Sequence, residues 1–192
     1  MKVTVGISVR HFHLTEEDYN LLYDEPMEVL RPINQPGQFA STKTATIKNG
    51  DRKIENVRLI GPARNYTQVE ISRTDAYALK LNPPVRASGD LKGASVITIE
   101  TDKGKIERPA CILADRHIHI TKEERKNYNL LKDSYSVKIP GEKGGIFDNV
   151  MIKESEKSYY EMHIDTDDAN AFGIKSGQEV EILNWHRKAR KI

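Results

Sequence analysis

Arg10-His11-Phe12-His13-Leu14-Thr15 returns 106 residues later as Arg116-His117-Ile118-His119-Ile120-Thr121. Two near-copies of one short segment, separated by about the length of a small domain, indicate an internal duplication. In a strand, residues i and i+2 project from the same face about 6 to 7 Å apart, whereas a helix would bring i and i+4 together. Each His-x-His pair therefore predicts a short strand with both imidazoles on one face and the apolar residue between them, Phe12 or Ile118, in a core.

Both histidine pairs run into the start of a helix. Thr121 followed by Glu124 has the spacing of a capping box, and Thr15 followed by Asp18 is a weaker version of it. Each pair is thus expected at a strand end that is fixed by the following helix.

The later part of each copy repeats with a second constant offset, of 93 residues. The matching segments are Asn56-Val57 with Asn149-Val150, Glu70-Ile71 with His163-Ile164, and Thr74-Asp75-Ala76 with Asp167-Asp168-Ala169. Because the two offsets differ by 13 residues, the first copy should carry an insertion. We place it at about residues 23 to 42, where Pro, Gly, Asn and Gln are frequent.

Elsewhere the sequence shows short segments of alternating polarity, separated by turns that contain glycine. The alternating segments are residues 44–47, 57–60, 96–99, 136–139 and 180–183. Short helices are expected at 75–79 and 167–172. We therefore predict a mainly β protein of two small β-barrels related by internal duplication, with short capping helices and an inserted flap.

The repeat also suggests a third metal ligand in each copy. Glu70 aligns with His163, and carboxylate and imidazole commonly replace one another at zinc sites. The predicted sets are His11, His13 and Glu70, and His117, His119 and His163. Three protein ligands leave a coordination position open, as catalytic sites do. The alternative is that Glu70 is an exposed strand carboxylate and His163 a packed side chain.

Two arginines flank the turn before Glu70. The planar guanidinium matches phosphate or carboxylate oxygens, so Arg58 and Arg64 suggest an anionic substrate, although either could be an ordinary surface charge. Two close metal ions would suit a substrate with several anionic oxygens.

Composition excludes several other functions. The net charge of the 192 residues is only +2, so nucleic acid is not an expected partner. No apolar run approaches the roughly 18 residues of a membrane span. The strand-like start leaves no room for a signal sequence, and Cys111 is the single cysteine, so we expect a cytoplasmic protein. The basic segment 187–191 reads as a solvated tail.

Several linked motifs, in order, resemble one family. They are Ser8-Val9-Arg10-His11-Phe12-His13-Leu14, Gln35-Pro36-Gly37-Gln38-Phe39-Ala40, Gly61-Pro62-Ala63-Arg64, Gln68-Val69-Glu70-Ile71-Ser72-Arg73-Thr74-Asp75-Ala76, Ser88-Gly89-Asp90-Leu91-Lys92-Gly93, Arg116-His117-Ile118-His119 and Met162-His163-Ile164-Asp165-Thr166-Asp167. Over roughly residues 3 to 183 the chain closely resembles the PduL-type phosphotransacylases, or phosphate propanoyltransferases.

The resemblance implies a reversible reaction in which acyl-CoA and phosphate give acyl phosphate and coenzyme A, at a dinuclear zinc site between two β-barrels. It implies one barrel of residues 1–9 plus 116–192 and another of 10–115. Each three-ligand set would hold one of two zinc ions, and Arg64 would hold phosphate as the catalytic residue. By position, Ser8, Arg31, Arg58 and Asn170 would contact coenzyme A or the site. Arg31 stands where the family is expected to have lysine.

The resemblance leaves some points open. The resemblance is compatible with either a propanoyl or an acetyl group as the transferred acyl group. It is also compatible with a homo-oligomer, with contacts to microcompartment shell or core enzymes, and with a role in propanediol degradation. Members housed in bacterial microcompartments usually carry an N-terminal amphipathic segment, whereas the printed sequence starts at the first strand. We expect a cytoplasmic location, with a microcompartment as the alternative. The competing functions are a metal-dependent thioester or phosphoester hydrolase, and a non-catalytic metal-binding barrel or microcompartment interaction module.

Overall fold

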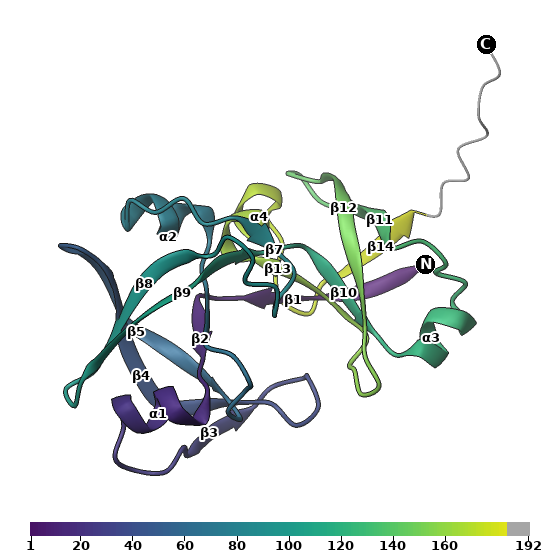
Figure 1. The fold of residues 1–192 in the computed structure, drawn as a ribbon. Helices are drawn as coiled ribbons and strands as arrows, with labels where there is room; N and C mark the ends of the chain where they lie inside the picture. The colour runs from purple at the N-terminus through teal and green to yellow at the C-terminus, as the bar shows by residue number, and fades with distance from the viewer. Residues whose placement is uncertain (184–192) are drawn as a thin grey trace. The chain divides into compact units, whose positions relative to one another are not determined.

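The computed structural model describes residues 1–183, which divide into two units. The C-terminal unit comprises Met1–Ile7, Arg116–Ile164 and residues 168–183, and the N-terminal unit comprises Ser8–Asp115 and Asp165–Asp167. Each unit contains its own closed six-stranded β-barrel (Figure 1). The basic segment 187–191 lies outside the described residues.

The barrel of the N-terminal unit closes through pairing of its last strand with its first. Around the barrel its strands are β4 (Phe39–Asn49), β5 (Arg52–Gly61), β2 (His11–His13), β6 (Gln68–Glu70), β9 (Lys105–Ala114) and β8 (Ser95–Glu100), which pairs with β4. Two short strands extend this sheet: β3 (Val29–Pro32) pairs with β4, and β7 (Val85–Arg86) pairs with β9. All four residues of β3, within the predicted insertion, are exposed.

The barrel of the C-terminal unit takes one strand from the start of the chain. Around the barrel its strands are β1 (Lys2–Ser8), β13 (Glu161–Asp165), β10 (His117–Ile120), β12 (Gly145–Glu154), β11 (Ser134–Ile139) and β14 (Glu179–Leu183), which pairs with β1. These two barrels and the short helices described next confirm the predicted fold class.

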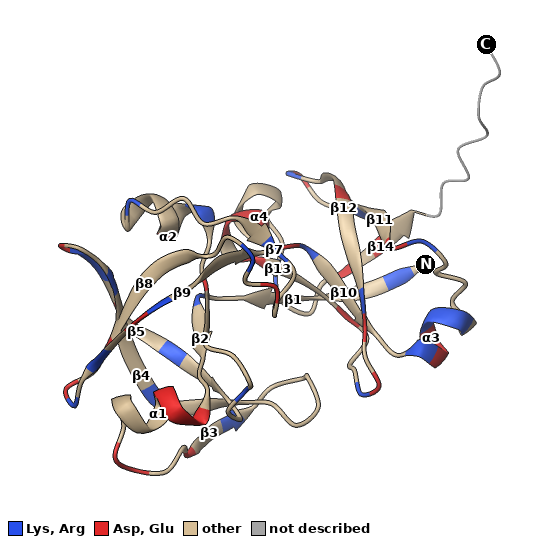
Figure 2. Cartoon of the chain, in the orientation of Figure 1, with Lys and Arg blue, Asp and Glu red and all other residues tan. Residues whose placement is uncertain are grey.

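Four short helices follow the strands that carry the histidines and their neighbours. They are α1 (Glu16–Leu22), α2 (Arg73–Ala78), α3 (Lys122–Asn127) and α4 (Thr166–Phe172). Thr121 and Glu124 form the predicted capping box at α3, and at α1 the Thr15 side chain accepts from the Asp18 backbone. The acidic first turn of α1 (Figure 2) complements the positive end of the helix dipole. Within residues 1–183 no helix has the length and apolarity to cross a bilayer.

Strand register independently reproduces the two sequence offsets. In the N-terminal barrel His11 lies opposite Glu70 on one side and Arg58 on the other. In the C-terminal barrel His117 lies opposite His163 and Met151, the residues that the offsets of 106 and 93 assign to them. In both barrels the histidine strand is antiparallel to the first neighbour and parallel to the second.

Each barrel has its own apolar core, and the residue inside each His-x-His pair belongs to it. Phe12 and Ile118 are fully buried, as predicted from the strand period. The asparagines that the second offset aligns, Asn56 and Asn149, both adopt left-handed backbone, with φ of 58° and 56°. Since non-glycine residues seldom adopt this conformation, the shared geometry supports the duplication.

A salt bridge that the sequence did not reveal recurs in both units. Arg10 contacts Asp75 through two N–O pairs of 2.9 and 2.7 Å, and Arg116 contacts Asp168 through two pairs of 2.7 Å. In each case the arginine precedes the histidine pair and the aspartate lies in the helix after the strand of the third predicted ligand. These bidentate pairs tie the two ligand-bearing segments together.

Replacing Asp75 by alanine should destabilise the protein by about 2 to 4 kcal/mol. Asp75 is buried, accepts from Arg10, and completes a capping box with Ser72, so its loss removes a charge-assisted pair and a helix cap together. Urea denaturation followed by circular dichroism measures the change. The matched variant Glu181→Ala, at an exposed strand position, should shift the midpoint little; equal shifts would contradict the assignment.

Candidate metal centres

The first predicted ligand set comes together on β2 and β6. The ligand atoms of His11, His13 and Glu70 lie within 4.8 Å of one another, and His11 Nε2 is 3.6 Å from Glu70 Oε2. The strand period puts the two imidazoles on the face opposite Phe12, and pairing of β2 with β6 brings Glu70 across from His11. Glu70 is buried, so the alternative of an exposed strand carboxylate is wrong.

Backbone carbonyls fix the tautomers of this set. His11 Nδ1 is 2.8 Å from the Val9 oxygen, and His13 Nδ1 is 2.9 Å from the Ile60 oxygen. A carbonyl oxygen only accepts, so each Nδ1 donates and each Nε2 keeps its lone pair for a metal ion. Burial, with smaller contributions from His11 and Arg64, holds the pKa of His13 well below its usual value, which keeps its imidazole neutral, as a ligand must be.

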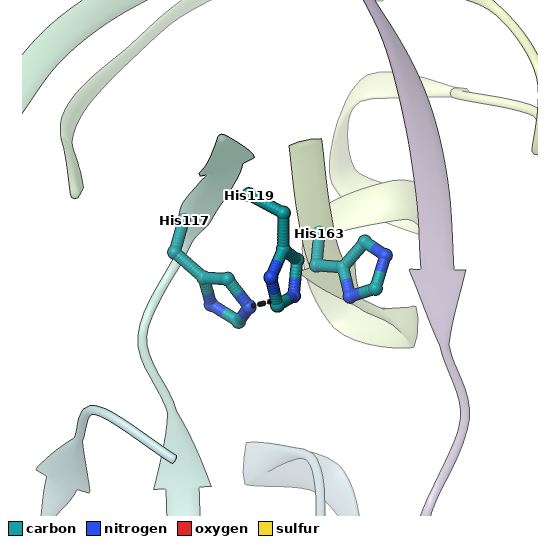
Figure 3. A group of neighbouring side chains, drawn as sticks. All are labelled: His117, His119 and His163. Carbon is teal, nitrogen blue, oxygen red and sulfur yellow. Dashed lines mark hydrogen bonds between the residues drawn. The ribbon is translucent and has the colours of Figure 1, made fainter. Parts of the chain in front are cut away.

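The second predicted set comes together on β10 and β13 (Figure 3). His117, His119 and His163 also offer ligand atoms within 4.8 Å of one another, and His117 lies opposite His163 in the sheet. The Nε2 atoms of His117 and His119 are 3.1 Å apart. Two imidazole nitrogens on one tetrahedral zinc ion would be separated by about 3.3 Å.

The donor atoms fit zinc. One set offers two imidazoles and a carboxylate and the other offers three imidazoles, which are the combinations of three-ligand zinc sites that leave a position for water or substrate. The backbone acceptors behind His11 and His13 are the outer contacts that metal-bound imidazoles usually make.

Arg64, the predicted phosphate ligand, lies near the first set, and its charge contributes to the lowered pKa of His13. Its guanidinium donates to the Tyr66 hydroxyl at 2.7 Å and to the Gln38 side-chain oxygen at 3.0 Å, and its backbone N–H donates to the Leu14 oxygen at 2.8 Å. Since a guanidinium has five N–H groups and these side-chain bonds use two, it keeps donors for an anion.

The other predicted substrate contacts lie at different distances from the sets. Ser8 Oγ is 3.5 Å from His11 Nδ1. Arg58 lies beside His11 through its backbone, but its guanidinium donates to the carbonyl oxygens of residues 41 and 42 on β4. Arg31 is exposed on β3, and Asn170 is exposed on α4, where its backbone oxygen accepts from Lys143. The structure therefore brings Ser8 close to a ligand and directs Nη1 of Arg58 toward carbonyl oxygens of β4.

Two residues beside the sets escaped the sequence analysis. Gln68 donates to Glu70, and Glu161 accepts from His163, each from two positions earlier on the same strand. The offset of 93 residues relates Gln68 to Glu161, so the repeat could have identified them.

Cys111 is fully buried, and burial raises the pKa of its thiol to about 12. A protonated, enclosed thiol is a poor nucleophile, so acyl transfer through Cys111 is not expected. Cys111→Ser should retain most turnover, and the native thiol should resist a disulfide reagent at pH 8 until denaturant is added. Loss of turnover with intact fold and metal content would instead make Cys111 the acyl carrier.

Comparison with known proteins identifies the relatives of this chain. A family model described as phosphate propanoyltransferase matches residues 4–175. A phosphate propanoyltransferase of Thermotoga maritima is 43% identical over 189 residues, covering 95% of this chain and 90% of the relative. Those of Shewanella putrefaciens and Clostridioides difficile are 41% and 39% identical, each covering 94% of this chain and 88% of the relative.

Proposed function

Because the chain belongs to the phosphate propanoyltransferase family, a family of acyltransferases, we propose that it moves a short acyl group between coenzyme A and phosphate. The substrates would be propanoyl-CoA, or a similar short acyl-CoA, and inorganic phosphate, and the products acyl phosphate and coenzyme A. The observation that carries the proposal is the pair of three-ligand sets at corresponding strands of the two repeats, with Arg64 beside the first.

The finer part of the proposal concerns the metal. We propose two zinc ions per chain, one on each set, acting as a dinuclear centre. Two features support it: in the first set the Nδ1 atoms of both histidines face backbone carbonyl oxygens, and in the second set the Nε2 atoms of His117 and His119 nearly converge. Elemental analysis should find about two zinc ions per chain. Magnetic coupling after cobalt(II) substitution would test whether the two ions lie close together.

The residues of the chain supply orientation and charge. Arg64 would hold phosphate through the N–H groups that Tyr66 and Gln38 do not use, and these two partners would fix the plane of the guanidinium. A phosphate oxygen forms a bond to the acyl carbon while the carbon–sulfur bond breaks, and coenzyme A leaves as a thiolate. Zinc bound to the two sets would polarise the thioester carbonyl and stabilise that thiolate.

A direct assay separates this function from hydrolysis. Thiol release from propanoyl-CoA is measured with and without phosphate, alongside acyl phosphate formation. The proposal predicts release that depends on phosphate and equals the acyl phosphate formed. Release without phosphate would favour a metal-dependent hydrolase, and no turnover by the zinc-loaded protein would favour a non-catalytic metal-binding barrel. The same assay over acetyl-, propanoyl- and butanoyl-CoA gives the chain-length preference.

A further inference from the structure

The third predicted ligand of each set has a hydrogen-bonding partner two residues earlier on its own strand. Gln68 Nε2 donates to Glu70 Oε1 at 2.6 Å. His163 Nε2 is 2.8 Å from Glu161 Oε2, and since a carboxylate accepts, the imidazole is the donor. Residues i and i+2 share a face of a strand, so each partner stands beside its ligand.

Strand register puts the two partners at equivalent places. Gln68 lies opposite His13 on the neighbouring strand, and Glu161 lies opposite His119. Each set and its partner therefore occupy a square of four strand positions. Two histidines on one strand lie opposite the third ligand and its partner on the neighbouring strand.

The two repeats place their carboxylate at different positions. In the first repeat the carboxylate is the ligand, Glu70, and in the second it is the partner, Glu161. Where the ligand is a carboxylate, its partner is an amide, which can donate a hydrogen bond. Where the ligand is an imidazole, its partner is a carboxylate, which accepts the imidazole N–H. Each pair has one ionisable carboxylate and one neutral group, so the two squares would have the same formal charge with the carboxylate in different places.

We propose that Gln68 and Glu161 are positioning residues, each of which orients the third metal ligand of its set. This inference rests on the proposed function, because it takes the two sets to bind zinc. With its Nε2–H directed at Glu161, His163 would have to bind the ion through Nδ1, whereas His11 and His13 would bind through Nε2. The two sets would then present different imidazole nitrogens to their ions.

The surroundings of both partners hold them in place. Glu161 is buried, and a Cβ atom added at Gly6 of β1 would come within 2.7 Å of its Oε2 and 3.0 Å of His163 Cδ2. Gly6 thus leaves room for the Glu161–His163 pair. Gln68 is fully buried; its Oε1 accepts from the Gly89 N–H at 2.7 Å and its Nε2 also donates to Ser88 Oγ at 3.0 Å. The amide cannot rotate without breaking these bonds.

The first test measures zinc affinity at the second set. A chain with His11→Ala and His13→Ala retains only that set, and zinc is titrated into the metal-free protein in competition with a chromophoric chelator. Glu161→Gln should raise the zinc Kd by about 10- to 100-fold, the usual cost of losing an outer carboxylate partner of a metal-bound imidazole. The control Glu181→Gln, the same change at an exposed strand position, should leave the Kd unaltered.

A pair exchange separates positioning from a general structural role. His163→Glu alone puts two carboxylates side by side and should weaken zinc binding strongly. Adding Glu161→Gln recreates the Gln-x-Glu arrangement of the first repeat, so the double variant should bind zinc at least tenfold more tightly than His163→Glu alone. A structural role for Glu161 predicts the opposite, because each substitution would then add its own loss.

In the otherwise unaltered chain, Gly6→Ala should displace the Glu161 carboxylate and reduce zinc content from two ions toward one. An unchanged Kd for Glu161→Gln, or a double variant no better than His163→Glu, would overturn the inference while leaving the zinc proposal standing. If the chain with His11→Ala and His13→Ala alone bound no zinc although its circular dichroism was native, the proposed metal site would be overturned and the inference with it.

Discussion

Arg64→Ala is expected to lower kcat/KM by about 100- to 1,000-fold while the protein keeps its zinc. Preorganised donors on a developing anion typically contribute this much to turnover, and the Arg64 guanidinium, near the first ligand set, keeps donors for phosphate. The loss should appear mainly as weakened dependence on phosphate in the forward direction and on acyl phosphate in reverse. Steady-state kinetics in both directions, with elemental analysis of the same sample, measures it.

Two further measurements make the assignment of Arg64 specific. Tyr66→Phe removes only the hydroxyl that accepts from Arg64, so its effect should be about five- to tenfold, as for the loss of one neutral hydrogen-bond partner. Added guanidinium ion should partly restore Arg64→Ala. Unchanged phosphate dependence in Arg64→Ala would remove this residue from the substrate site.

His119→Ala should lose one zinc ion per chain and lower turnover by about three orders of magnitude or more. Lewis-acid stabilisation is worth several kcal/mol, and each 1.36 kcal/mol is a factor of ten in rate. His119 is buried, and its Nε2 lies 3.1 Å from that of His117, so the substitution removes one of two adjacent nitrogens of the proposed site. Zinc stoichiometry and turnover are measured together on the purified variant.

The smaller variant His119→Gly provides the control for a general packing defect. Imidazole added to the buffer should enter the space left by the side chain and recover zinc binding and part of the turnover. If His119→Ala kept two zinc ions and full activity, the second set would not be a metal centre of the reaction.

Sequence alone predicted the features that depend on local period and on the repeat. The strand geometry of His11 and His13 follows from alternation, and the companion of each pair, Glu70 or His163, follows from aligning the copies. Register then places these residues opposite one another, because barrel strands pair in the same order in both units. The same alignment pairs Asn56 with Asn149, and the structure adds that both adopt left-handed backbone.

Features that depend on tertiary pairing could not be predicted. The acceptor for His13 is the carbonyl of Ile60, which is 47 residues distant and chemically like any other carbonyl, so no pattern distinguishes it. Sequence alone does not distinguish Arg58 from Arg64, yet Arg58 donates to two carbonyl oxygens of β4 whereas Arg64 donates to the side chains of Tyr66 and Gln38. The two carbonyls that accept from Arg58 belong to residues 41 and 42, which lie where β4 shifts register against β5, a feature of the pairing of two strands rather than of one segment.

The place of β1 in its barrel has a consequence for biosynthesis. Lys2 pairs with Glu181, so during synthesis β1 must wait for β14, which follows it by more than 170 residues, before the ring of six can be completed. Until β14 is made, its two neighbours, β1 and β11, would present unsatisfied edges, which are templates for association between nascent chains. The barrel formed by β2 to β9 has all its strands about seventy residues sooner, so folding during translation should begin with that half, and ring closure of the other should come later and be slow.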